Sequence, residues 1–172
     1  PATARLAHYF ERAPRVAQYA ARLLAHPDNA RARAAVAQAP DAEEASDWQL
    51  FRRLFNHIKT RDIPMTAPVE MTYDNDRPQT MSFLYRTADV GQTGDAENDV
   101  AVVDVPAQTL VSIGIRGRYT HARFERCVEK LNAWLSTDSL SGAQWQAAGE
   151  PRYLGYNSPF IPGFLRYGEV QI

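Results

Sequence analysis

The side chain best suited to chemistry is His57, because two arginines, Arg53 and Arg61, stand four residues before it and four residues after it. On a helix this spacing lets all three side chains project the same way. A neutral imidazole is a common metal ligand, and guanidinium groups pair bidentately with carboxylates. On a helical wheel His57 lies about 100° from the centre of the apolar stripe, on a flank that it shares with Leu50. The structural alternative is a surface histidine between solvated arginines.

Other side chains that could do chemistry also have structural alternatives. Met65 and Met71 could be thioether ligands, but their positions beside and within a predicted strand favour the core. Cys127 falls on the apolar face of a predicted helix, which favours a buried thiol. Glu70 and Glu169 could form a polar pair on a ligand or could be exposed strand carboxylates, and we favour exposed carboxylates.

Composition indicates a single globular domain over residues 1–172. Apolar residues make up 45% and charged residues 23% of the chain, and its one cysteine excludes an intrachain disulfide. The formal net charge of −1 argues against a nucleic-acid partner, and no apolar run is long enough for a membrane span. We therefore expect a soluble protein, in the cytoplasm or, after removal of a targeting segment, in an organellar lumen.

No sequence motif indicates catalysis. The chain contains no His-Glu-x-x-His or Cys-x-x-Cys segment, and its residues do not suggest a Ser-His-Asp or Cys-His set. We therefore expect a binding protein rather than an enzyme.

Hydrophobic periodicity predicts the elements that position these side chains. Apolar residues at spacings of three and four predict a helix over 48–58, capped by Asp47, and a second helix that opens at Thr120. Alternation of apolar and polar residues predicts strands in a first hairpin, in a second hairpin and at the end of the chain. These strands are 69–73 with 81–85, 100–105 with 110–116, and 152–157 with 165–172.

The two halves share an order of elements that predicts an internal repeat. Each half has an amphipathic helix and a small-Pro-apolar step, at 66–69 and at 157–160. A repeat requires a hairpin before the first helix, which we place within residues 1–22. Residues 27–45 have no counterpart, and their alanines predict a helical insertion centred on Ala30–Gln38. The predicted fold class is α+β, with two ββαββ repeats whose antiparallel sheet can close towards a barrel.

Three segments, in this order along the chain, are similar to motifs of the SOUL heme-binding proteins. Residues 51–58 resemble the first helix of that family. Ile63–Val69 resembles its Ile-x-Met-Thr-x-Pro-Val signature. Tyr156–Val170 resembles its closing motif of Tyr-Asn-x-Pro, then an aromatic residue and Arg, then Glu-Val or Glu-Ile.

The resemblance implies a distorted eight-stranded antiparallel barrel, built from two repeats and flanked by two helices. It also implies binding of heme or another porphyrin in a shallow apolar groove between the first helix and the loop before the last strand. Some members of the family are thought to use a helix histidine as axial ligand, and others hold the porphyrin by apolar contact with basic residues at the propionates.

Transferred to this chain, the resemblance predicts a groove lined by one helix and one loop. Arg53 and Arg61 would pair with the propionates, and His57 would be the optional axial ligand of the iron, the one metal ligand expected. The loop could instead plug the end of the barrel. The expected cofactor-binding residues are Leu50, Arg53, Leu54, His57, Arg61, Pro159, Phe160, Ile161 and Phe164.

Two other functional interpretations remain open from the sequence. The chain could be a scaffold subunit that keeps the fold without a ligand and docks a protein partner through residues 1–45. It could also be a small-molecule effector-binding or hydrolytic relative, for which an inward-facing carboxylate at Glu70 or Glu169 would be the sign.

Overall fold

The structure is a computed structural model of the chain that describes most residues from 31 onward. It describes residues 31–40, 46–87, 89–96, 99–106, 110–137, 147, 149–158 and 160–172. The described residues fall into two compact units, one within Arg22–Gln108 and one within Thr109–Ile172, which we name the α3 unit and the α4 unit after their helices. Each unit is described by itself.

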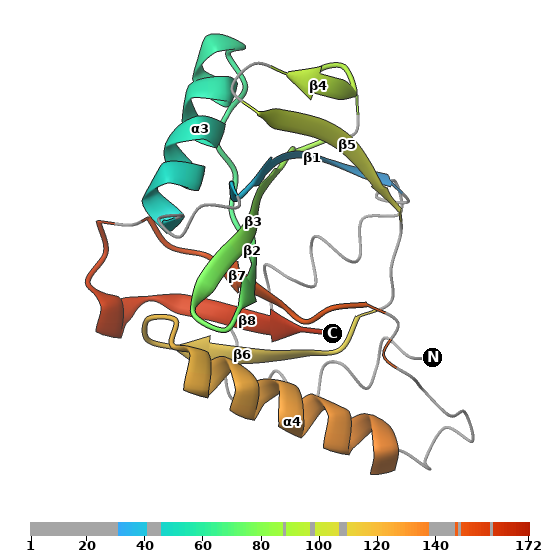
Figure 1. Cartoon of the computed structure of the whole chain (residues 1–172), viewed down its shortest axis with the longest axis vertical. Helices are drawn as coiled ribbons and strands as arrows, with labels where there is room; N and C mark the ends of the chain where they lie inside the picture. The colour runs from blue at the N-terminus through green and yellow to red at the C-terminus, as the bar shows by residue number, and fades with distance from the viewer. Residues whose placement is uncertain are drawn as a thin grey trace. The chain divides into compact units, whose positions relative to one another are not determined.

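The α3 unit is an antiparallel sheet of five strands with one helix packed on it (Figure 1). The order of neighbouring strands is β4-β5-β1-β3-β2. Its elements are β1 (Arg31–Gln38), α3 (Asp47–Thr60), β2 (Val69–Asp74), β3 (Arg77–Leu84), β4 (Gly94–Ala96) and β5 (Val100–Pro106).

The predicted helical insertion is wrong for Arg31–Gln38, which form strand β1 between β3 and β5. Ala35 pairs with Phe83 on one side and with Val102 on the other. Alanine favours a helix in isolation, but two hydrogen-bonded neighbours outweigh that propensity. Small side chains on β1 also let α3 pack closely on the sheet, because Ala35 is fully buried in the core beneath it. The remaining residues of 27–45 lie outside the described part, apart from 39 and 40.

Helix α3 confirms the predicted helix, but its cap lies one residue earlier than expected. Ser46, not Asp47, is the N-cap, and it forms a capping box with Gln49. The Ser46 hydroxyl accepts from the Gln49 N–H while the Gln49 amide oxygen accepts from the Ser46 N–H, so two end donors are satisfied together.

The β2–β3 hairpin is confirmed, whereas the predicted hairpin of 100–105 with 110–116 is wrong. Strands β2 and β3 pair from Val69 opposite Phe83 to Asp74 opposite Arg77. Strand β5 pairs instead with β1 and β4, so both of its edges are occupied by strands of its own unit.

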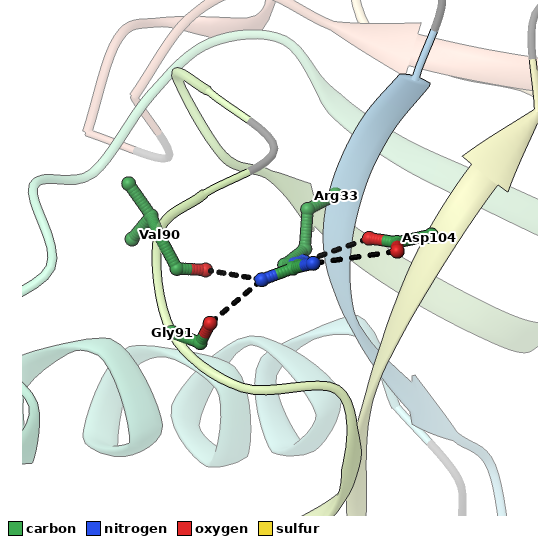
Figure 2. Close-up of polar contacts among 4 residues, drawn as sticks. All are labelled: Arg33, Val90, Gly91 and Asp104. Atoms are coloured by element: carbon green, nitrogen blue, oxygen red, sulfur yellow. Dashed lines mark hydrogen bonds and ion pairs between the residues drawn. The ribbon is translucent and has the colours of Figure 1, made fainter.

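An arginine joins three segments of the α3 unit. Figure 2 shows Arg33 of β1 in a bidentate contact with Asp104 of β5, at 2.7 Å from Nε to Oδ1 and 3.3 Å from Nη2 to Oδ2. Its remaining terminal nitrogen, Nη1, donates to the carbonyl oxygens of Val90 and Gly91. The guanidinium therefore holds the loop before β4 against the sheet.

The α4 unit is a three-stranded antiparallel sheet with one helix on it, in the strand order β7-β8-β6 (Figure 1). The predicted helix is confirmed, and its buried residues include Phe124, Cys127 and Leu131. The elements are β6 (Ser112–Arg116), α4 (His121–Thr137), β7 (Arg152–Gly155), the 3-10 turn η2 (Gly163–Leu165) and β8 (Tyr167–Gln171).

The α+β class, the antiparallel strands and the two helices are confirmed. Within the described residues neither set of strands closes on itself, so the expected closed barrel of eight strands and its two repeats are not confirmed. The hairpin predicted within residues 1–22 lies outside the described residues. Among the described residues no helix is long and apolar enough to cross a membrane.

Candidate functional site

His57 lies in the core of the α3 unit, so its predicted place on an exposed flank of the helix is wrong. Its exposed fraction is 1%, and its Nε2 is 2.8 Å from the Tyr85 hydroxyl oxygen. The physical reason is its spacing: position 57 is three residues after Leu54 and seven after Leu50, which puts it on their buried face. Its Nδ1 is buried without a hydrogen-bond partner in the part of the chain that the structure describes.

Burial holds the His57–Tyr85 pair uncharged. Loss of water lowers the pKa of His57, and the positive charge of Arg61 lowers it further. Loss of water also raises the pKa of the Tyr85 phenol, although Arg61 and Arg33 oppose that rise. The two uncharged side chains can share a hydrogen bond. For Nε2 to bind iron instead, the Tyr85 hydroxyl would have to move away from it.

The two arginines predicted beside His57 do not share its buried position. The Arg53 guanidinium donates to the Gln38 carbonyl at 2.8 Å and pairs with Asp99 at 2.9 Å, so it links α3 to the end of β1 and to the residue before β5. Arg61 is exposed just after α3.

Leu50 and Leu54 lie on the buried face of α3, where they are fully buried in the core with Phe83. The side of α3 that is open to solvent carries aromatic rings instead. Trp48 and Phe55 are exposed, and each stacks on Phe51, with ring centroids 5.9 Å and 5.8 Å apart. We name Trp48, Phe51 and Phe55 the aromatic row. Periodicity assigned all three to the buried face, because that pattern does not distinguish the centre of an apolar stripe from its margin.

The loop before β8 presents apolar side chains to solvent. Phe160 is 88% exposed and Phe164 73% exposed, and Ile161 and Leu165 are exposed as well. We name these four residues the apolar tip. Pro159, also expected in the site, lies outside the described residues.

Hydrogen bonds fix the backbone of this loop. The Ile161 N–H donates to the Ser158 carbonyl at 3.0 Å and the Leu165 N–H donates to the Pro162 carbonyl at 2.9 Å. The Arg166 Nε donates to the Ile161 carbonyl at 2.8 Å. The tip is therefore an ordered loop that holds its apolar side chains outward.

Arginines that the sequence reasoning missed lie beside the apolar tip. The aliphatic stem of Arg118 lies against Gly163, where a Cβ built on that glycine would be 3.2 Å from the Arg118 Cβ. The Arg116 guanidinium lies over the Tyr167 ring, 5.9 Å from its centroid. The β6–β8 pairing brings these arginines to the tip, because Arg116 is opposite Tyr167. Only a correct prediction of that pairing could have found them.

A buried carboxylate occupies the face of this sheet opposite the buried apolar side chain of Val170. Glu169 is 1% exposed, which makes the expectation of an exposed strand carboxylate wrong. The Tyr156 hydroxyl donates to it at 2.6 Å and the Gln171 amide donates at 3.0 Å. Burial raises the pKa of Tyr156, and the adjacent Glu169 carboxylate raises it further. Sequence reasoning missed this because alternation along β8 places Glu169 on the face opposite Val170 but does not tell whether that face is covered.

The structure also describes the surroundings of Cys127, Met65 and Met71. Cys127 is buried as predicted, and burial raises the pKa of its thiol. Met65 is exposed, contrary to its predicted core role, while half-buried Met71 lies 3.1 Å from the Tyr73 hydroxyl. Within the described ranges no three His, Cys, Asp or Glu side chains gather as metal ligands would.

Solved structures share this fold at low sequence identity. The C-terminal domain of EcmrR superposes with a TM-score of 0.52 at 14% identity, covering 83% of this chain and 90% of that one. EcmrR in a complex with DNA gives 0.55 at 13% identity, covering 92% and 62%. A hydrolase from Listeria innocua gives 0.53 at 14% identity, covering 82% and 86%. These likenesses define the class of fold.

The family is given by the sequence itself. The model of the SOUL heme-binding protein family matches residues 15–172, nearly the whole chain, so the chain belongs to that family. No curated protein sequence matched it.

Proposed function

We propose that the chain binds heme or a related tetrapyrrole, without catalysis, for transport, buffering or sensing. Membership of the SOUL heme-binding family supports a porphyrin ligand. The observation that carries the proposal is the apolar tip, whose Phe160 and Phe164 rings are held in solvent by an ordered loop. Exposed aromatic rings of this kind suit the flat apolar face of a porphyrin.

The charges beside the tip suit the other end of the ligand. Heme carries two propionates, and guanidinium groups bind carboxylates with charge-assisted hydrogen bonds. Arg118 fits this role better than Arg53, because Arg118 lies exposed against the tip whereas Arg53 is paired with Asp99.

On α3 itself, the exposed aromatic row suits contact with a flat apolar ligand better than the predicted Leu50 and Leu54 do. Those two leucines are fully buried, whereas Trp48 and Phe55 are exposed. Because His57 is buried and bonded to Tyr85, the proposed binding mode relies on apolar contact and arginines and does not require an axial histidine.

A hemin titration followed by absorbance tests the proposal. We expect a saturable Soret shift for the wild type and a Kd raised at least about tenfold for the double variant Phe160→Ser/Phe164→Ser, because two apolar contacts are lost. Val103→Ser, at another exposed apolar residue, is the matched control and should bind as the wild type does.

His57→Gln separates the two binding modes. Glutamine can still hydrogen bond Tyr85, so an unchanged Soret spectrum is the expected result. A changed Soret maximum in His57→Gln would instead indicate that His57 is the axial ligand. Absence of a saturable shift in the wild type would reject tetrapyrrole binding.

Glu169 favours a second candidate, binding of a small cationic effector. The groups that donate hydrogen bonds to Glu169 are a phenol and an amide, both uncharged. A bound cation would therefore neutralise the charge of this buried carboxylate. A titration with a lipophilic cation such as tetraphenylphosphonium should then show binding that Glu169→Gln abolishes, while Glu70→Gln leaves it intact. Equal binding by the wild type and Glu169→Gln would reject this candidate.

The scaffold interpretation, with docking through residues 1–45, stays a prediction. Of these residues the structure describes 31–40, where β1 is an interior strand with partners on both edges.

A further inference from the structure

The apolar tip remains unusual even if it contacts a tetrapyrrole, because its four exposed apolar residues lie within only six positions, 160–165. Loops more often turn such side chains inward. Here the bonds from Arg166 to Ile161 and from Leu165 to Pro162 fix the backbone of the loop in the conformation in which the rings are exposed. The tip is a rigid apolar projection.

The surroundings of the tip are cationic although the chain as a whole is not. Residues 110–124 and 151–168 contain no aspartate or glutamate, while the formal charge of the whole chain is −1. The Gly117 N–H donates to the Arg166 carbonyl at 2.8 Å, and the Arg123 guanidinium donates to the carbonyls of Arg116 and Arg118. These contacts bring the backbone of Arg116, Arg118 and Arg166 together, with the Arg123 guanidinium beside the first two.

Figure 1 shows that the turn between β6 and α4 lies at the same end of the three strands as η2. The Arg118 stem lies against Gly163 within the tip, and the Arg116 guanidinium lies over Tyr167 just after it, so positive charge stands beside the apolar tip. The first acidic residue of α4, Glu125, is already paired with His121 at 3.0 Å. Exposed apolar side chains and arginines are therefore neighbours at this end of the α4 unit.

Exposed apolar side chains with arginines beside them match the layers of an anionic membrane surface. Apolar side chains enter the acyl region, and arginines just behind them meet the phosphates and carboxylates of the headgroups. A groove on a protein partner would require complementary walls, whereas a fluid bilayer accepts a projecting tip of any outline.

We propose that the apolar tip inserts into the surface of an anionic lipid bilayer, with Arg116, Arg118 and Arg166 on the headgroups. This interaction needs no tetrapyrrole, so it stands or falls independently of the proposed function.

The test is co-sedimentation of the full chain, without hemin, with vesicles of phosphatidylcholine alone or with about a third phosphatidylserine. We expect binding to the anionic vesicles, weakened at least about tenfold in Phe160→Ser/Phe164→Ser and in Arg118→Glu. Val103→Ser and Arg86→Glu are the matched controls, an exposed apolar residue and an exposed arginine of the α3 unit.

Insertion is separated from surface attraction by Phe160→Trp with brominated lipids. Greater quenching in this variant than in the wild type supports insertion. The proposal is overturned if the wild type does not sediment with anionic vesicles, or if the double variant sediments as well as the wild type. Self-association that the double variant abolishes, without vesicle binding, would assign the tip to a second copy of the chain and also overturn it.

Discussion

At the scale of single residues, His57 shows how a side chain suited to chemistry can serve the core instead. Its spacing from the flanking arginines was correct, but spacing from Leu50 and Leu54 decided its place. Both patterns coexist in the same helix, and only packing on the sheet selects between them. The arginines at the tip and the buried Glu169 depend on pairings between distant strands, which no local pattern reports.

Burial of His57 makes the stability of the protein depend on pH. Its folded-state pKa is lowered by burial and by Arg61, so the unfolded chain binds the proton more readily. The stabilisation by neutral His57 is complete above the unfolded pKa of about 6.5 and is lost as pH falls from there through the lowered pKa. In urea unfolding, we expect acidification from pH 7.5 to 5.5 to lower the free energy of unfolding of the wild type more than that of His57→Gln.

The control for this prediction is Asn56→Gln, at an exposed residue of α3 whose side chain does not titrate. That variant should keep the pH dependence of the wild type in the same range. An identical pH dependence in the wild type and His57→Gln would contradict the buried position of this histidine.

At the scale of elements, local patterns succeeded where one element provides its own signal. Helices α3 and α4 and the β2–β3 hairpin were predicted because their periodicity or turn lies within a short segment. Strand β1 was missed because its alanines favour a helix and its two partners are far along the chain. The pairing of β5 was missed because residues 110–116, the next segment with strand periodicity, suggested a hairpin partner for it.

Ala35→Leu tests the place of β1 directly. As an interior strand beneath α3, β1 has no room for the larger side chain, and we expect a loss of roughly 1–3 kcal/mol in the free energy of unfolding. A helical surface insertion would tolerate leucine without loss. Urea unfolding measures the change, with Gln38→Leu, at the exposed end of the same strand, as the control.

Gly168→Ala tests the packing of β8 in the α4 unit. A Cβ at Gly168 would overlap the hydroxyl of buried Tyr153 and lie 2.6 Å from its ring carbon Cζ, so the ring must move. We expect thermal unfolding to show a loss of about 1–3 kcal/mol. Gly149→Ala, where no atom lies within 4 Å of the added carbon, should leave the unfolding midpoint unchanged. Equal stability of the two variants would refute this packing.

At the scale of the whole molecule, a net charge of −1 conceals an uneven distribution of charge. Arginines gather around the apolar tip, while carboxylates such as Asp99 and Asp104 pair with arginines of the α3 unit. Net charge argued against a nucleic-acid partner, but it does not report where on the surface the individual charges lie. Charge matters here by position, because exposed charges act over about 10 Å at ordinary ionic strength.

This distribution predicts a salt-dependent affinity for hemin. If arginines bind the propionates, raising the salt from about 0.05 M to about 0.5 M should weaken hemin binding several-fold. The dimethyl ester of hemin lacks the carboxylates and should bind with an affinity that salt changes little. Parallel absorbance titrations of the two ligands provide the measurement, and the same salt dependence for both would argue against a role for the arginines.

The interior place of β1 has a consequence for synthesis on the ribosome. Arg31 pairs opposite Pro106, so the two strands that meet there are separated by most of the α3 unit. The sheet cannot be completed until β5 has left the exit tunnel, and the edge of β1 that pairs with β5 stays unpaired during that interval. A nascent chain paused before residue 100 should therefore be a substrate for chaperones that hold unpaired strands, and one released after β5 should not.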